Sequence, residues 1–195
     1  MLDLDPLSTE TVEELRRAAA ASRADPRVMP TTPPAPAQPP PVPPIVGTFL
    51  ALSDCTAAVP AEQPANGQLG DDELCPIGDG HQLRADAAAT YVAMDEAFAA
   101  TFGESLCISD SYRSFGAQQS LYRQKPNLAA APGTSNHGWG MAVDLFCGID
   151  DPGSAEHAWL DENGDDYGWV NPNWAQPGGS RPEPWHWEFE PSLLD

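Results

Sequence analysis

The chain is poor in positive charge. Nine lysines and arginines face 29 aspartates and glutamates, which gives a net charge of −20 over 195 residues. Nucleic acid and anionic lipid surfaces require basic groups that neutralise phosphates, so we expect neither as a partner. No apolar run approaches the roughly 20 residues that cross a bilayer, so no transmembrane segment is predicted. Residues Met1–Asp5 also lack the basic start and apolar stretch of a secretory signal.

Cysteine is scarce, and its four residues include no close pair. A CxxC zinc site is therefore not expected, whereas an even count is compatible with two disulfides. Four cysteines allow three pairings, and free buried thiols are the alternative. We favour Cys55–Cys75, which would close a Gly/Pro-rich loop, and Cys107–Cys147, which would join two apolar, strand-like segments. Since disulfides persist in oxidising compartments, we expect an extracytoplasmic or cell-surface protein.

Proline is abundant, with 22 residues, and it is concentrated near the N-terminus. The pattern predicts three parts: an N-terminal helix within 1–25, a Pro-rich linker at 26–46 and a folded domain at 47–195. Proline-dense segments favour extended polyproline II and act as semi-rigid spacers. The linker would be a stalk that holds the domain away from a surface or, equally, a leader without a role.

The folded domain mixes helical and strand periodicities. Three- and four-residue spacing of apolar side chains predicts helices, and alternation of apolar and polar side chains predicts strands. The predicted elements are a loop-rich stretch at 49–83, helices at 84–102, 114–122 and 154–163, strands at 106–109 and 141–146, a loop at 126–136 and a half-buried strand at 185–189. They follow no βαβ rhythm, so we predict a single compact α+β domain with a small antiparallel sheet and flanking helices.

Histidine is rare as well, with four residues, and two of them have unusual neighbours. His137 lies in a Gly-rich turn, where Gly138 would leave space for a ligand. His186 lies among large apolar side chains, which favour the neutral imidazole that binds zinc. For His81 and His157 we expect structural roles, with His157 on an exposed helix.

Asp144 interrupts an apolar strand. An aspartate in such a position is costly unless it is paired or binds a metal. A structural Asp–Arg pair is the alternative, although arginine is scarce in this chain. With His137 and His186, Asp144 completes a set of two imidazoles and one carboxylate, which is typical of a catalytic zinc site with one open position.

Two glutamates flank His186 in the sequence. Glu183 precedes Pro184, which favours an extended backbone, so Glu183 and His186 do not share a helix face. Glu183 is either a general base for a metal-activated water or a solvated side chain. Glu188 lies on the same strand face as His186, and it is either a hydrogen-bond partner of that imidazole or surface charge.

Arg113 follows a predicted strand and precedes a predicted helix. A guanidinium at such a junction can bind a substrate carboxylate or stabilise an oxyanion. A plain surface arginine is the alternative.

Four separated motifs together resemble the zinc D,D-carboxypeptidases of the VanY type. The matching residues are Ser-x-His-x-x-Gly-x-Ala-x-Asp at 135–144, Glu-x-Trp-His at 183–186, Tyr112-Arg113-Ser114, and Gln118 with Leu121 and Tyr122. The wider group includes the VanX dipeptidases, phage L-alanyl-D-glutamate endolysins and the hedgehog signalling domain. The resemblance covers about residues 75–190 and departs at Ser111, where many relatives have glycine.

The resemblance implies a bacterial, zinc-dependent D-alanyl-D-alanine carboxypeptidase that acts on the peptide stems of peptidoglycan in the cell wall. It implies Zn²⁺ on His137, Asp144 and His186, with Glu183 as the catalytic base. Substrate contacts would come from Arg113, Ser135 and Gln118, and we expect a monomer. An L-alanyl-D-glutamate endopeptidase and a non-catalytic, zinc-containing binding module are the alternatives.

Overall fold

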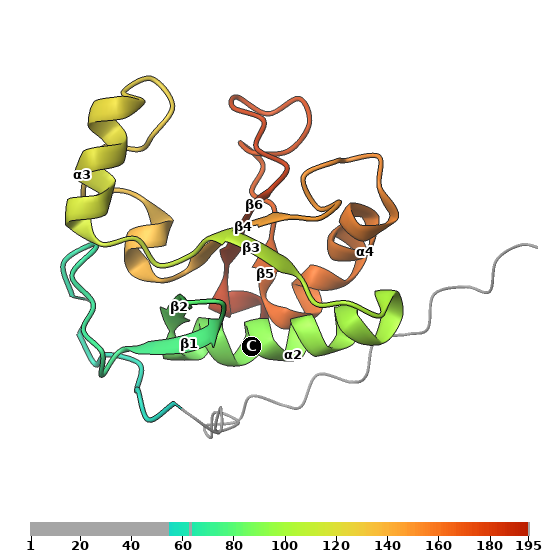
Figure 1. The fold of residues 1–195 in the computed structure, drawn as a ribbon, viewed down its shortest axis with the longest axis horizontal. Coiled ribbons are helices and arrows are strands. Elements are labelled where there is room, and N and C mark those ends of the chain that lie inside the picture. Colours follow the sequence, from blue (N-terminus) through green and yellow to red (C-terminus); the bar gives the residue numbers. More distant parts are fainter. Residues whose placement is uncertain (1–54, 63, 195) are drawn as a thin grey trace, which may run out of the picture. The chain divides into compact units, whose positions relative to one another are not determined.

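The computed structural model describes residues 55–62 and 64–194, which lie within one compact unit. The predicted helix at 1–25, the linker at 26–46 and the start of the domain at 47 lie outside these residues. The elements are β1 (Leu74–Gly78), β2 (His81–Arg84), α2 (Ala85–Phe102), β3 (Cys107–Asp110), α3 (Phe115–Gln124), η1 (Asn136–Trp139), β4 (Ala142–Phe146), α4 (Ala155–Asn163), η2 (Gly164–Tyr167), β5 (Trp169–Val170), β6 (His186–Phe189) and η3 (Pro191–Leu194). Helices and short antiparallel strands share this unit (Figure 1), which confirms the α+β class.

The main sheet has four strands in the order β3-β4-β6-β5, and each neighbouring pair is antiparallel. In the central pair, Asp144 lies opposite His186, and Val143 lies opposite Trp187. Since side chains alternate between the two faces of a strand, Val143 and Trp187 face one side while Asp144 and His186 face the other. The register therefore separates an apolar face from a polar face.

Helix α2 supplies much of the core on the apolar side of this sheet. Tyr91, Met94 and Phe98 are buried and belong to one hydrophobic cluster with residues of β4 and β6. Figure 1 shows α2 running below the sheet. The helix predicted at 84–102 is confirmed, and Gly103 ends it in the left-handed conformation with φ 83°.

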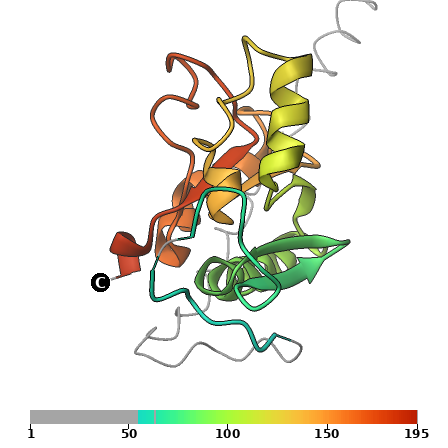
Figure 2. The same cartoon turned by 90° about the vertical axis from the view of Figure 1, so that its left-hand side faces the viewer.

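Strands β1 and β2 form a hairpin where the sequence predicted a loop-rich stretch at 49–83. Leu74, Cys75 and Leu83 are buried, and the chain reverses at Asp79 and Gly80, which both have positive φ. The hairpin lies beside α2 (Figure 2). Strands of four and five residues contain too few alternations for the period of two to stand out in the sequence.

The predicted helices at 114–122 and 154–163 are confirmed, and the first continues to Gln124. Ser114 and Ser154 cap them by accepting hydrogen bonds from the backbone N–H groups of Ala117 and His157. None of the helices in the described part of the chain is long and apolar enough to cross a membrane.

The C-terminal segment confirms one expectation and corrects another. Helix α4 ends at Asn163, as predicted, with Gly164 as its C-cap, and η2 follows directly and ends at the left-handed Gly168, with φ 76°. A Cβ at Gly164 would lie 2.5 Å from the carbonyl oxygen of Trp169, so glycine is required there for close packing. Strand β6 is not half-buried, since all four of its residues are buried. It is a central strand, and both of its faces are covered.

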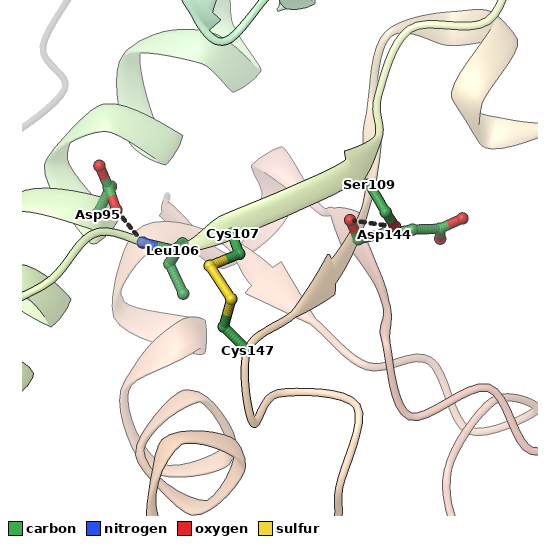
Figure 3. The surroundings of a disulfide bond; sticks show 6 residues. All are labelled: Asp95, Leu106, Cys107, Ser109, Asp144 and Cys147. Carbon is green, nitrogen blue, oxygen red and sulfur yellow. Dashed lines mark hydrogen bonds between the residues drawn. A yellow bond between two sulfur atoms is a disulfide. The ribbon is translucent and has the colours of Figure 1, made fainter.

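Both favoured disulfides are present, Cys55–Cys75 and Cys107–Cys147, and the described residues contain no free cysteine. The second bond links β3 to the residue that follows β4 (Figure 3). Near it, Ser109 donates a hydrogen bond to the carbonyl oxygen of Asp144 over 3.1 Å. The strand that carries Asp144 is thus held to its neighbour by covalent and polar contacts.

Candidate metal centre and active site

Three polar residues form a row across the sheet. Asp110 of β3 lies opposite Asp144 of β4, which lies opposite His186 of β6. Residues directly opposite one another on antiparallel strands have neighbouring side chains. The register therefore brings a carboxylate and an imidazole together although they are 42 residues apart in the sequence.

His137 reaches this row from the short helix η1. The helix ends at Gly140, which has φ 64° and lies against the backbone of Arg84. A Cβ at Gly138 would clash with the side-chain amide of Asn66. The space beside Gly138, predicted to be left for a ligand, is therefore filled by Asn66.

The three predicted metal ligands lie together. His137 Nε2 is 3.3 Å from Asp144 Oδ1, and His186 Nδ1 is 2.9 Å from the same oxygen. One potential ligand atom from each residue lies within 4.8 Å of the other two. The partners of Asp144 are thus two imidazoles rather than the arginine of the alternative interpretation. Two nitrogens and one carboxylate oxygen that converge in this way are suited to zinc.

The second nitrogen of each imidazole has a protein partner. His137 Nδ1 lies 2.8 Å from the carbonyl oxygen of Ser111, which can accept its proton. His186 Nε2 lies 2.9 Å from the carboxylate of Glu188. These partners can keep a proton on His137 Nδ1 and on His186 Nε2, so that His137 Nε2 and His186 Nδ1 become free to bind a metal once the proton shared with Asp144 is displaced. Glu188 is buried, so its interpretation as surface charge is wrong.

The site without metal is strongly polarised. Burial alone would raise the pKa of Asp144, but hydrogen bonds and positive charge from His137 and His186 hold it well below its usual range. Burial alone would lower the pKa of His186, but its bonds to Asp144 and Glu188 raise that pKa from 6.5 to about 9. A proton therefore occupies the place that a cation would take, and metal binding must displace it.

Glu183 lies at the rim of this cluster and is half-buried. Its carbonyl oxygen accepts a hydrogen bond from the N–H of His186 over 2.9 Å, which closes the turn through Pro184. Burial raises the pKa of the Glu183 carboxyl, with opposing effects from the charges of His186 and Asp144. A carboxylate with a raised pKa is a better proton acceptor than an ordinary glutamate.

The Arg113 side chain is held by hydrogen bonds beside the row of polar residues and is not an exposed surface arginine. Its Nε donates to Asp110 over 3.0 Å, its Nη2 donates to the same carboxylate, and its Nη1 donates to Gln118 over 2.7 Å. Its side chain is 13% exposed. The backbone N–H of Arg113 also donates to the carbonyl oxygen of His137 over 3.0 Å. The guanidinium is therefore fixed near the metal ligands and remains partly accessible.

Gln118 and Ser135, predicted to contact substrate, lie close to these residues. Gln118 is buried, and its two polar atoms are engaged by Arg113 and by the carbonyl oxygen of Ala130. Ser135 is buried at the start of η1, and its carbonyl oxygen accepts a hydrogen bond from Asn66 over 2.8 Å. In this arrangement Gln118 supports Arg113.

The other two histidines have other partners. His157 is buried rather than exposed, with Nδ1 2.6 Å from the carbonyl oxygen of Ile149, which corrects the expectation of an exposed helix. His81 Nδ1 lies 3.0 Å from the hydroxyl of Ser111. Neither belongs to the metal-ligand group.

Sequence reasoning missed two residues next to the site. The ring of Trp174 lies 5.1 Å from that of His186, and Asn171 donates to the carbonyl oxygen of His186 over 2.7 Å. Both belong to the segment between β5 and β6, where an asparagine beside a proline is the ordinary composition of a loop. In the sequence, Pro172 and the neighbouring turn residues indicate only a loop, so neither Asn171 nor Trp174 could be recognised as part of a site.

The chain resembles known proteins over most of this unit. The family model of VanY, D-alanyl-D-alanine carboxypeptidase, matches residues 80–192. A D-alanyl-D-alanine carboxypeptidase of Enterococcus faecalis is 28% identical over 139 residues, which are 67% of this chain and 52% of that protein. The chain thus spans about half the length of this curated relative.

The chain is also similar to solved structures. VanYB in complex with D-alanine-D-alanine is 25% identical, with a TM-score of 0.51, over 67% of this chain and 80% of that one. A VanY D,D-pentapeptidase variant in complex with Zn(II) is 24% identical, with a TM-score of 0.50, over 69% of this chain and 85% of that one. Because the family match covers more than half of the sequence and every residue of the site, this chain belongs to the VanY family of D-alanyl-D-alanine carboxypeptidases.

Proposed function

We propose that the protein is a zinc-dependent D-alanyl-D-alanine carboxypeptidase that acts on the stem peptides of peptidoglycan. The observation that carries this proposal is the convergence of His137 Nε2, Asp144 Oδ1 and His186 Nδ1 beside a glutamate. The donor set fits zinc, because each imidazole directs one nitrogen towards the shared site and is oriented by a partner on its other nitrogen. When bound there, zinc would lower the pKa of a water and polarise the scissile carbonyl.

Glu183 would move the proton in this reaction. Its carboxylate takes a proton from the attacking water as the oxygen adds to the carbonyl carbon of the terminal peptide bond. It then returns that proton to the amide nitrogen as the C–N bond breaks, which releases D-alanine and leaves the shortened stem with a new carboxyl group. General acid–base catalysis of this kind contributes about 10²–10⁴ in rate.

Arg113 would bind the terminal carboxylate of the substrate or the developing oxyanion. A guanidinium has five N–H donors, and three of them are used by Asp110 and Gln118, so two remain. Because those bonds also restrict the side chain, its orientation is largely fixed before substrate arrives. Gln118 would act through Arg113, while Ser135 remains a candidate for direct contact.

The two disulfides support a working location outside the cytoplasm or at the cell surface. The substrate proposed here is found there as well. A net charge of −20 makes a phosphate-rich partner unfavourable. We further propose that the catalytic domain spans 47–195 and works as a monomer.

Glu183→Gln tests the catalytic proposal. The zinc-loaded protein and this variant are incubated with a pentapeptide stem, and released D-alanine is measured together with bound zinc. We expect zinc binding to persist while the rate falls by about 10²–10⁴. Glu190→Gln, at an exposed position just beyond β6, is the matched control and should retain full activity. Full activity of Glu183→Gln with zinc retained would remove Glu183 from this role.

A further inference from the structure

Asn171 is a buried side chain that the proposed reaction does not yet use. It follows β5 directly and is 5% exposed. Its Nδ2 donates to the carbonyl oxygen of His186 over 2.7 Å and to that of Glu183 over 3.2 Å. Two carbonyl acceptors on one side require the NH₂ end of the amide there, which fixes its orientation. One side chain therefore holds the backbone of the proposed base and of a proposed metal ligand.

The end of the sheet explains why a side chain is needed there. The ladder between β5 and β6 pairs Trp169 with Phe189 and Val170 with Glu188, and it ends at that point. Pro172 follows Asn171 and lacks the backbone N–H that could continue the ladder. The Asn171 side chain therefore provides the hydrogen bonds to the strand segment that leads into β6.

The position of Asn171 is itself constrained. Its own carbonyl oxygen accepts a hydrogen bond from Gln176 Nε2 over 2.8 Å. Its Oδ1 is buried and has no hydrogen-bond partner among the residues that the structure describes. A buried acceptor without a partner costs stability, and such groups call for an explanation beyond packing. The two hydrogen bonds donated by the NH₂ end of the same amide provide this explanation.

We propose that Asn171 is a positioning residue, which fixes Glu183 and His186 as one unit so that the base carboxylate keeps a constant place relative to the metal. This inference rests on the proposed function. The segment between the two residues contains Pro184 and Trp185, and its turn is closed by the bond from the N–H of His186 to the carbonyl oxygen of Glu183. Without the Asn171 amide, both carbonyl groups would lose a donor and the turn could shift.

Two variants and one control test this inference in the full chain. Asn171→Asp keeps the size of the side chain but replaces the NH₂ group, which donates both hydrogen bonds, by a carboxylate oxygen that would face the two carbonyl groups. Asn171→Ala removes the amide without adding charge, and it decides the test if the Asp variant does not fold. Asn173→Ala, at an exposed position in the same segment, is the matched control. Circular dichroism shows which proteins are folded.

Two readouts are combined. The first is a double-mutant cycle with Glu183→Gln on kcat for D-alanine release. We expect the Asn171 variants to lose roughly 10–100-fold in kcat with KM little changed, as for other residues that orient a metal site. In the Glu183→Gln background the same change should cost less than about twofold, because the base that Asn171 positions is already absent. Substitution of a residue that only stabilises the fold would lower kcat by the same factor in both backgrounds.

The second readout is the zinc dissociation constant, measured by competition with a chelator, and it does not depend on turnover. We expect weaker zinc binding in Asn171→Ala than in Asn173→Ala, because His186 loses a backbone constraint. An equal kcat loss in both backgrounds, or equal zinc affinity in the two variants, would overturn the inference. If the parent protein releases no D-alanine, the proposed function fails, and if Glu183→Gln alone retains full activity, Glu183 is not the base. In both cases the zinc measurement still decides whether Asn171 holds His186.

Discussion

The two faces of the β4–β6 pair contain neighbouring residues of the same strands but have opposite character. On one face Val143, Leu145 and Trp187 are almost fully buried in the hydrophobic core. On the other face Asp144 and His186 meet through one hydrogen bond of 2.9 Å between Asp144 Oδ1 and His186 Nδ1. The apolar face gains its stability from burial, whereas the polar face keeps buried charge by pairing it. The first face should therefore control folding and the second should control chemistry.

The largest expected effect is on the polar face. Asp144→Asn keeps the shape of the side chain but removes the anionic ligand that both imidazoles contact. We expect D-alanine release to fall to background and zinc to be lost, while the circular dichroism spectrum stays that of the native protein. Metal analysis and an activity assay check this, with the exposed Asp150→Asn as control. An unfolded Asp144→Asn protein would show that the polar face is also needed for the fold.

The next largest effect is on the apolar face. Leu145 is fully buried, and Leu145→Ala should reduce the free energy of unfolding by about 2–5 kcal/mol, because it removes apolar contact and leaves a cavity. Activity per folded molecule should remain close to that of the parent protein. Urea denaturation and an active-site titration measure the two quantities. Leu128→Ala, at a position that is 62% exposed, should change the stability by less than about 0.5 kcal/mol. A large activity loss in folded Leu145→Ala would mean that the two faces are not separable.

Glu188→Gln gives a smaller effect on the polar face. The carboxylate lies 2.9 Å from His186 Nε2 and orients that imidazole. Replacing it should weaken zinc binding or activity by about 10–100-fold, the usual range for a partner of a metal ligand. Chelator competition measures the change. Glu162→Gln, at an exposed position near the end of α4, should leave zinc affinity unchanged.

The smallest effect concerns pH in the protein without metal. The pKa of His186 is raised from 6.5 to about 9 in the folded state. The folded state therefore binds this proton more tightly than the unfolded state does. The resulting stability is fully present below about pH 6.5 and is lost as the pH rises towards 9. After chelation, we expect Tm to fall across this interval. His186→Gln should flatten that dependence, and an unchanged slope would contradict the charged contacts described for His186.

The polar face was predictable from the sequence because its polar residues stand among apolar neighbours. Asp144 interrupts an apolar strand, and His186 stands between two tryptophans, so burial without partners would be costly. Arg113 and Glu183 became specific only through the resemblance, since an arginine before a helix and a glutamate before a proline are common. Their geometry depends on Asp110, Gln118 and a turn, which no local pattern specifies.

Other features depend on contacts between distant segments. Asn171 and Trp174 have the composition of an ordinary loop, and their importance appears only when the segment folds back onto His186. The burial of both faces of β6 has the same origin, because an alternating strand does not reveal whether its polar face is covered. The β1–β2 hairpin is too short for periodicity to indicate it, although the helix at 84–102 was long enough.

Mass spectrometry of one pentapeptide stem after treatment with the zinc-loaded protein tests the central claim most directly. If the polar face is a D-alanyl-D-alanine carboxypeptidase site, the product is a tetrapeptide together with one equivalent of free D-alanine, and neither appears with Asp144→Asn. Cleavage between L-alanine and D-glutamate would instead indicate an endopeptidase with the same metal centre. An intact stem in the presence of stoichiometric bound zinc would contradict a catalytic role for this face.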